Sequence, residues 1–412
     1  MATCQLRIPH DRQVTFAPQL VNNLPCSCNC IGSCRPQAII LQWAIADFVR
    51  ENIVPRSALK RMILGALVIA PTIAAADEGG VSFWAPGFFG SLAATPEQPG
   101  WSLTNQYYHA SMTAGAGVAI ARERTLGDIP ANLSLSANLN AGMISRADFD
   151  FLTLSYVFKT PVLGGQASIA LLGAYGRVDT SLDAQLSGTL SGTATTAAGP
   201  ISGSIPFSRS DNTNSVLWGF GDLSPMFSLR WAAGVSNYMV YVIGSVPVGA
   251  YDPGRLSNAG IGHGAIDGGF GYTYFNQKTG QEFSGVLGFT YNLTNNSTQY
   301  QNGVDMHFDW AISQFLTKQF QIGLVGYAYD EIGCDSGSGN RVGCFQSRVF
   351  GVGPQVGFIF PVSRTIQGYL NIKGYKEFEN ANRPDGWNTW VTFALSPAEQ
   401  APSTPSRRMR SM

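Results

Sequence analysis

The chain has 412 residues, no formal net charge and only 13% charged residues. Soluble proteins usually carry about 25% charged residues, so this composition indicates a surface that is partly solvated by lipid. The neutral balance excludes nucleic acid as an expected partner, because nucleic-acid-binding surfaces are strongly basic. No run of 18 or more apolar residues occurs, so we expect no membrane-spanning helix.

Residues 1–53 resemble neither an export signal nor the rest of the chain. We interpret them as translated sequence upstream of the true start, at Val54 or Met62, or as a disordered cytoplasmic extension that is removed with the signal. Five of the seven cysteines lie here: Cys4, Cys26, Cys28, Cys30 and Cys34. Their spacing does not match paired zinc ligands, and we predict no metal site and no cofactor.

Residues 54–76 carry the pattern of a secretory signal peptide. Lys60 and Arg61 form a positive start, an apolar core follows at 62–70, and Ala74-Ala75-Ala76 offers a cleavage site. The core is too short to span a membrane as a helix. The mature protein would therefore begin near Asp77.

Residues 77–100 are rich in aromatic residues, Gly and Pro, without regular alternation. A cluster of large apolar side chains is poorly accommodated in water. We therefore predict a short plug-like segment in the lumen of a barrel, rather than an unpaired periplasmic leader. The side chains expected to fill the lumen are Phe83, Trp84, Phe88 and Phe89.

The alternating pattern over residues 101–395 predicts a β-barrel. Segments of about ten to fifteen residues alternate apolar with small or polar side chains, and turns rich in Gly, Asn, Asp, Ser and Pro separate them. Outer-membrane strands show this period because one side faces lipid and the other faces the lumen. In lipid, only helices and closed barrels satisfy every backbone donor and acceptor. The predicted fold is an all-β transmembrane barrel of the outer membrane, with 12–14 antiparallel strands.

Thirteen strands are predicted, at 101–113, 131–144, 149–160, 166–180, 213–232, 238–249, 264–277, 281–294, 300–317, 319–332, 345–361, 366–380 and 387–395. Bacterial single-chain barrels have an even number of strands. One long bent strand over 131–160 would give 12. A further strand within 181–212, which we interpret as a long extracellular loop, would give 14. Periplasmic turns are expected at 234–237, 278–280, 317–318 and 361–365, and extracellular loops at 250–264, 295–300, 333–345 and 380–387.

Charged side chains on the strands are expected to point into the lumen, because Arg or Lys facing lipid at mid-membrane costs about 2–4 kcal/mol. The densest group is Asp305-x-His307-x-Asp309, on one face of a strand whose other face, with Met306, Phe308 and Trp310, would meet lipid. This group could hold a polar part of a solute, exchange protons, or form a ladder paired to Lys373 or Arg348. The predicted lumen or substrate-path residues are Asp222, Asp267, Glu282, Asp305, His307, Asp309, Lys373 and Glu377.

Cys334 and Cys344 flank a Gly- and Ser-rich loop between two predicted strands. The periplasm is oxidising, so we predict that these two cysteines form a disulfide. The last predicted strand contains Trp390 and Phe393. Residues 396–412 follow it as a polar, basic tail.

The stretch Tyr108-His109-Ala110-Ser111 supports a different hypothesis. His109 and Ser111 are two residues apart and share one face of the first predicted strand. Outer-membrane lipid hydrolases use such an H-x-S arrangement, with Ser as the nucleophile and His as the base. The sequence does not assign the third, orienting group to Asn105 or to Asn138.

Several stretches occur together and in order. They are Trp218-Gly-Phe-Gly-Asp222-Leu-Ser-Pro225, Pro247-Val-Gly-Ala-Tyr251, Asp267 before Tyr272-Thr-Tyr274, Lys278-Thr-Gly-Gln-Glu282-Phe-Ser284, Tyr291-Asn-Leu, Thr298-Gln-Tyr300-Gln-Asn-Gly303-Val-Asp-Met-His307, Gly326-Tyr-Ala-Tyr329, Arg348-Val-Phe-Gly-Val-Gly353-Pro354 and Tyr375-x-x-Phe378-Glu-Asn380. This set resembles the transporter-like family named for the meta-pathway of phenol degradation, over about residues 79–395. The resemblance implies an outer-membrane barrel that takes up aromatic or other hydrophobic compounds and is not an enzyme.

We therefore expect an outer-membrane channel of a Gram-negative bacterium that passes small aromatic or other hydrophobic solutes passively. Outer-membrane lipid and these solutes would be its partners, and the sequence does not specify its oligomeric state. The alternatives are an outer-membrane lipid hydrolase that uses His109 and Ser111, and a structural or adhesive barrel.

Overall fold

The computed structural model describes residues 82–125, 131–196, 199–340 and 343–398. The predictions for the extension 1–53 and the signal peptide 54–76 lie outside the described residues, as does most of the tail 396–412.

The described chain forms thirteen strands in one sheet. Their bounds are β1 Gly100–Thr125, β2 Ala131–Val157, β3 Gln166–Thr196, β4 Gly199–Phe220, β5 Ser224–Ala233, β6 Ser236–Ser245, β7 Ala265–Asn276, β8 Gln281–Asn292, β9 Asp305–Phe315, β10 Phe320–Glu331, β11 Arg348–Pro361, β12 Ile366–Ala381 and β13 Asp385–Pro397. Every pairing is antiparallel.

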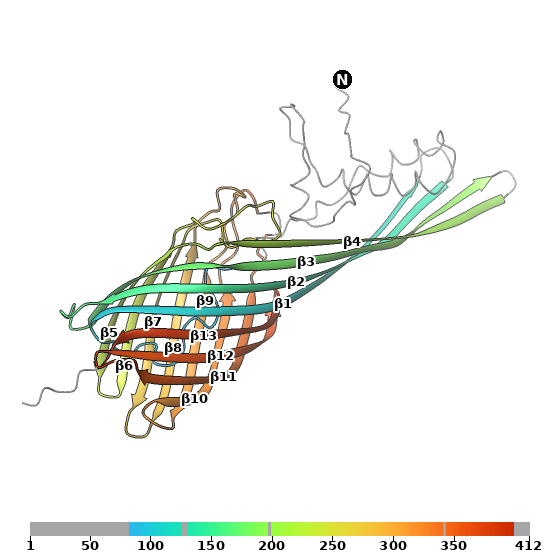
Figure 1. Cartoon of the computed structure of the whole chain (residues 1–412). Helices are drawn as coiled ribbons and strands as arrows, with labels where there is room; N and C mark the ends of the chain where they lie inside the picture. The colour runs from blue at the N-terminus through green and yellow to red at the C-terminus, as the bar shows by residue number, and fades with distance from the viewer. Residues whose placement is uncertain (1–81, 126–130, 197–198, 341–342, 399–412) are drawn as a thin grey trace, which may run out of the picture.

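Twelve of these strands close into a ring (Figure 1). Strand β1 pairs with both β2 and β13, β2 pairs with β3, and β3 pairs with β5. From β5 to β13 each strand pairs with the next one along the chain. Strand β4 pairs with β3 alone and stands outside the ring. The predicted barrel is therefore confirmed, with 12 strands in the wall.

Strands β4 and β5 occupy consecutive parts of one strand position beside β3. The part of β3 from Tyr175 onward pairs with β4, whereas Gln166–Leu172 pairs with β5. The predicted continuous strand 213–232 is wrong, because the chain leaves the ladder at 221–223. There the loop 246–264 packs against the chain, and Ala250 N donates to Phe220 O at 2.8 Å.

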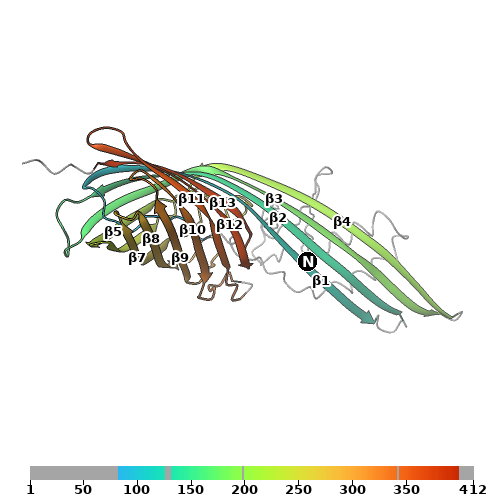
Figure 2. The same ribbon diagram turned by 90° about the horizontal axis from the view of Figure 1, so that it is seen from below.

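Strands β1 to β4 project well beyond the ring as a curved, four-stranded sheet (Figures 1 and 2). The last pairing of β1 with β13 is Thr113 with Asp385, and β1 then continues with β2 alone to Thr125. The prediction of a loop over 181–212 is wrong, because β3 and β4 run through most of it. Its small and polar residues suggested a loop, but Leu182, Ala184 and Leu190 keep the period of a strand.

Strand β2 covers the strand predicted at 131–144 and most of the one predicted at 149–160, so the alternative of one long strand is correct. Short links at 234–235, 277–280, 316–319 and 362–365 lie at one end of the ring, together with the longer link 158–165. Longer links at 246–264, 293–304 and 332–347 lie at the other end, together with the short link 382–384. The prediction of a long loop at 380–387 is wrong, because β12 continues to Ala381 and β13 begins at Asp385. The other predicted turns and loops show the asymmetry expected between periplasmic turns and extracellular loops.

The outward side of the ring is apolar. Its exposed side chains include Trp101, Leu103, Leu152, Leu154, Ile169, Leu171, Phe227, Val240, Val242, Phe270, Phe289, Ile312, Ile322, Leu324, Ile372 and Phe393. A closed ring with an outward apolar belt is a transmembrane barrel of the outer-membrane type, because lipid solvates the belt and the ring leaves no edge to satisfy. Within the described residues, no helix is long and apolar enough to cross a membrane.

Candidate functional site in the barrel lumen

Seven of the eight predicted lumen residues point inward and are between 0% and 3% exposed. These seven are Asp267, Glu282, Asp305, His307, Asp309, Lys373 and Glu377. Strand β9 shows the alternation, since its three titratable side chains are buried while Met306, Phe308 and Trp310 are only partly buried. The eighth residue, Asp222, lies elsewhere, at the break between β4 and β5.

The segment 82–99 runs inside the ring ahead of β1 (Figure 1). Its aromatic rings pack on one another, with centroids of Trp84 and Phe88 5.6 Å apart and those of Phe88 and Phe89 5.4 Å apart. Phe88 also lies 6.2 Å from the buried ring of Trp390 in the wall. Phe83 packs, with Phe89, against a buried cluster that includes Met239, Tyr241, Ile243 and Val286.

Asp309 and Lys373 bind the backbone of this segment. The carboxylate of Asp309 accepts hydrogen bonds from Gly87 N at 3.1 Å and Phe89 N at 3.2 Å. The Lys373 ammonium donates to the carbonyl oxygens of Gly87, Phe88 and Phe89 at 2.5, 3.3 and 2.9 Å. The Asp309 carboxylate therefore accepts from the N–H groups of one turn, and the Lys373 ammonium donates to the carbonyl oxygens of the same turn. Both buried charges are hydrogen-bonded in this way.

Gly87 is required at this turn for two reasons. Its φ of +83° is rarely adopted by residues with a Cβ, and a Cβ there would lie 2.8 Å from Cε2 of Tyr375. The buried Tyr375 therefore fixes how closely the backbone of the segment approaches β12.

Glu282 holds the segment one turn further along. Its carboxylate accepts hydrogen bonds from Leu92 N and from Ser91 Oγ, both at 3.0 Å. Ser91 Oγ also lies 2.7 Å from Ser313 Oγ and accepts from Gln355 Nε2 at 2.7 Å. This polar network joins β8, β9 and β11 to the segment.

The contacts continue to the end of the ring where β1 begins. Ala94 N donates to Thr273 Oγ1 at 3.0 Å, and Arg230 forms an ion pair with Glu97 at 3.2 Å. Glu97 N also donates to the side chain of Gln166 at 2.7 Å. The wall residues Thr273, Ser313, Gln355, Arg230 and Gln166 were not among the predicted site residues. The period-two rule could have found those on the polar faces, but nothing in the sequence says that they meet the segment.

His307 lies between the segment and the wall. Its ring stacks on Trp84 with centroids 3.6 Å apart and planes 12° apart. Its Nε2 lies 2.9 Å from Asp267 Oδ2 and 3.4 Å from the hydroxyl of Tyr241. An interior His–Asp pair is thereby covered by the largest side chain of the segment.

Asp305 and Glu377 bind tyrosines rather than cations. The hydroxyl of Tyr329 donates to Asp305 at 2.7 Å, and that of Tyr327 donates to Glu377 at 2.7 Å. The predicted ladder to Lys373 or Arg348 does not form, because Lys373 is occupied by the carbonyls of the segment and Arg348 is exposed at the end of β11.

Asp222 closes the break between β4 and β5. Its carboxylate accepts from Gly249 N at 2.8 Å and from Ile261 N at 2.9 Å, so it binds two parts of one loop. Burial raises the pKa of this carboxyl above its ordinary value, while the two backbone hydrogen bonds act in the opposite direction. Asp222 therefore organises the loop that packs at the break, and its role on the substrate path stays a prediction.

The structure joins Cys334 and Cys344 in a disulfide, with their Cα atoms 4.6 Å apart. This bond closes the loop between β10 and β11. Among the described residues, no group of three or more His, Cys, Asp or Glu side chains is arranged to hold a metal ion.

The H-x-S pair lies on the outward face of β1, away from the lumen. His109 Nδ1 is 2.7 Å from Asp148 Oδ1 on β2. Asp148 faces His109 directly across the β1–β2 ladder. The sequence did not identify this partner, because strand register is not readable from one chain.

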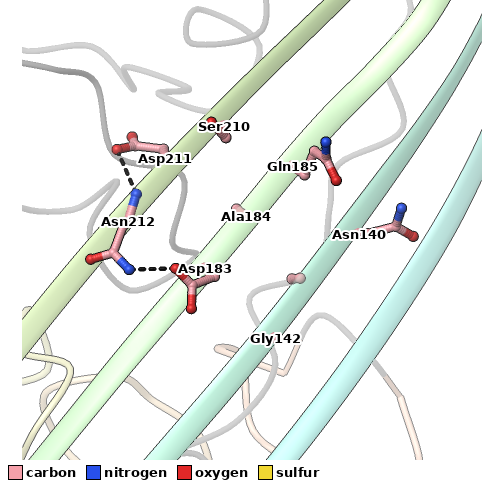
Figure 3. Close-up of a pocket in the computed structure, with 9 residues that line it drawn as sticks. Asn140, Gly142, Asp183, Ala184, Gln185, Ser210, Asp211 and Asn212 are labelled. Carbon is pink, nitrogen blue, oxygen red and sulfur yellow. Dashed lines mark hydrogen bonds between the residues drawn. The ribbon is translucent and has the colours of Figure 1, made fainter.

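A further pocket lies on the projecting sheet, outside the ring (Figure 3). Asn140, Asp183, Gln185 and Asn212 line it from three strands, and Asn212 Nδ2 donates to Asp183 Oδ1. The lining also includes Ala141, Gly142 and Ala184, and it belongs to the part of β2, β3 and β4 that takes no part in the wall.

A family model described as "Putative MetA-pathway of phenol degradation" matches residues 130–393. Among solved structures, an outer membrane channel from Pseudomonas putida F1 is similar, with 14% identity, 73% of this chain and 97% of that chain covered, and a TM-score of 0.48. A FadL homologue from Pseudomonas aeruginosa has 9% identity, coverage of 72% and 90%, and a TM-score of 0.28. The transport unit of the autotransporter AIDA-I from Escherichia coli has 8% identity, coverage of 74% and 92%, and a TM-score of 0.33. Among curated proteins, none matches this chain.

Proposed function

The chain belongs to the MetA-pathway phenol-degradation family, and we propose that it is an outer-membrane channel for the passive uptake of small aromatic or other hydrophobic compounds. In this proposal the segment 82–99 is a plug that narrows the lumen. The observation that carries the proposal is the set of contacts between the segment and the wall. A lumen that is filled by aromatic rings suits selective passage better than bulk diffusion of ions or sugars.

The way the segment is bound supports a removable plug. Asp309, Lys373 and Glu282 contact mainly its peptide groups, through hydrogen bonds of 2.5 to 3.3 Å. Each hydrogen bond to a charged group contributes about 1.5–3 kcal/mol. Such bonds hold a defined position, yet the segment can leave the wall one contact at a time.

The surroundings of Phe88 support an aromatic solute. The rings of Trp84, Phe89 and Trp390 lie within 6.2 Å of the Phe88 ring, in edge-to-face geometry. In the buried cluster against which Phe88 packs, Trp390 Nε1 and Tyr375 Oη lack a hydrogen-bond partner among the described residues. An aromatic molecule with one polar substituent could take the place of Phe88 and satisfy one of these atoms.

The test is uptake by cells that express the full-length chain, compared with cells that carry an empty vector. The solutes are a labelled single-ring aromatic acid, a labelled alkane and a labelled sugar of similar size. We expect faster uptake of the aromatic or alkane solute and no change for the sugar. Equal stimulation of all three, or of none, would contradict the proposal.

A matched variant replaces residues 82–95 by a Gly- and Ser-rich linker of the same length. We expect this variant to admit the sugar as well and to conduct more current per channel in planar bilayers. An unchanged conductance in a folded variant would show that the segment is not a plug.

A further inference from the structure

A polar cluster interrupts the outward face of the barrel on β1 and β2. Tyr107, His109 and Ser111 follow one another on the outward face of β1. Asp148 Oδ1 on β2 lies 2.7 Å from both His109 Nδ1 and the hydroxyl of Tyr107. Two pairs further along the ladder, and on the same face, Ser111 lies directly opposite Arg146.

The cluster lies near the outer rim of the membrane. His109 is the tenth residue of β1, and about 9–11 residues of a tilted strand cross a bilayer. Toward the periplasmic end, the same outward face carries Trp101 and Leu103 on β1 and Leu152 and Leu154 on β2, all of which are exposed and apolar. The side chains of the cluster are therefore placed where the acyl esters of outer-leaflet lipids lie.

The hydrogen bond to Asp148 fixes the chemistry of the His109 ring. A carboxylate only accepts hydrogen bonds, so Nδ1 carries a proton, and in the neutral form of the ring Nε2 presents a lone pair. The ring is held on its other side by Trp387, whose centroid lies 4.9 Å away. A neutral imidazole that is oriented in this way is a general base.

Ser111 is within reach of that base. Residues two apart on one face of a strand lie about 6.6 Å apart at their Cα atoms, a gap that the imidazole and a rotation of the serine side chain can span. The hydroxyl of Ser111 forms no hydrogen bond with a described residue, so this rotation breaks no such bond. Arg146, opposite Ser111, offers a cation beside the position where negative charge would develop.

The geometry points to a serine ester hydrolase site on the outer surface of the barrel, with Ser111 as nucleophile, His109 as base and Asp148 as the residue that positions His109. Its substrate would be a carboxylic ester of a lipid acyl chain. This inference is independent of the proposed channel function, because the cluster and the lumen lie on opposite sides of the wall.

The reaction would proceed in two steps. Ser111 Oγ forms a bond to the carbonyl carbon of the ester while its proton passes to His109 Nε2, and the C–O bond to the alcohol then breaks as His109 returns that proton to the departing oxygen. In the second step water attacks the acyl-serine, again through His109, and releases the fatty acid and free Ser111. Water is the only co-reactant.

The first test is covalent labelling of the folded full-length protein, in detergent micelles, with a fluorophosphonate probe. Mass spectrometry is expected to locate one adduct on Ser111. Ser111→Ala should abolish the adduct, and His109→Asn should slow labelling about 10²- to 10⁴-fold, the usual contribution of a general base. Ser136→Ala is the matched control. Ser136 is an exposed serine on the face of β2 that also carries Arg146 and Asp148, and no histidine lies two residues away from it.

The second test is release of fatty acid from a phospholipid in the same micelles. Asp148→Asn should lower kcat while KM stays within about twofold, because Asp148 acts through His109 and not on the substrate. A merely structural role would change folding, which heat-dependent migration on gels reports separately. Absence of an adduct on wild-type Ser111, or labelling that is equally fast in His109→Asn, would overturn the inference.

Discussion

At the scale of single residues, the lumen pairs buried charges with peptide groups rather than with one another. Asp309 takes two backbone N–H groups and Lys373 takes three carbonyls, all from residues 87–89. A buried charge without such partners would be strongly destabilising. The position of the segment and the ionisation of these two side chains therefore depend on each other.

Lys373→Met removes the ammonium that binds the carbonyls of Gly87, Phe88 and Phe89. We expect the folded barrel to lose about 2–4 kcal/mol and the single-channel conductance to rise, since the carbonyls lose a charged donor and the segment loosens. Thermal unfolding in detergent and planar-bilayer recording measure the two effects. The control is Lys376→Met on the same strand, whose exposed ammonium donates to Gly386 O. Equal effects of the two substitutions would contradict the role of Lys373.

Asp222→Asn tests the loop carboxyl. The folded-state pKa of Asp222 is raised by burial, so its contribution to stability is largest at low pH and is lost as the pH rises through the folded value. Asparagine keeps one acceptor oxygen and does not titrate. The variant should therefore be less stable than the wild type at pH 3, and the gap in melting temperature should narrow toward pH 7. A difference in melting temperature that widens from pH 3 to pH 7 would contradict a raised folded-state pKa of Asp222.

At the scale of elements, two segments are fixed by bonds that strand pairing does not supply. The segment 82–99 is held by side chains of the wall from β3, β5, β7, β8, β9, β11 and β12. The loop between β10 and β11 is closed by the Cys334–Cys344 disulfide. Removing either constraint should change one local element and leave the ring closed.

Replacing Cys334 and Cys344 by serine together opens a loop of about ten residues. The chain-entropy relation gives a loss of about 2–3 kcal/mol for a closed loop of this size. We expect faster proteolysis within 332–347 and an unchanged heat-dependent gel shift of the barrel. Peptide mapping after alkylation, with and without reductant, checks the bond in the wild type, and free thiols at both positions without reductant would contradict it.

At the scale of the whole molecule, the wall and the projecting sheet are built from the same four long strands but depend on different pairings. The ring closes through residues up to Thr113 on β1 and up to Leu172 on β3. Beyond these points, in the described chain, β1 to β4 pair only with one another.

Shortening the sheet tests this separation. Gly115 faces Gly142 and Leu182 faces Thr213 across their ladders, so an Asn-Gly turn can replace 116–141 and another can replace 183–212. We expect the shortened protein to fold, to shift on gels with heating and to conduct like the full-length barrel. If it fails to assemble while a variant with only one shortened hairpin folds, the projecting sheet contributes to closure of the ring.

The sequence by itself determined the fold class and the faces of most strands. Period-two alternation is a local property, so Asp305, His307 and Asp309 could be assigned to one face, and Phe270 and Phe289 to the other, without knowing any partner strand. The cost of a charge in lipid then indicated which face points inward. The same reasoning failed over 181–212, where small and polar residues weaken the contrast between the faces.

Only the tertiary structure decided which residues meet. The break at 221–223, the contacts of Asp309 and Lys373 with residues 87–89, and the pairing of Asp148 with His109 all join residues that are distant in the chain. Each depends on strand register and on how the ring closes. These are set by the balance of all pairings around the barrel, which no local pattern carries.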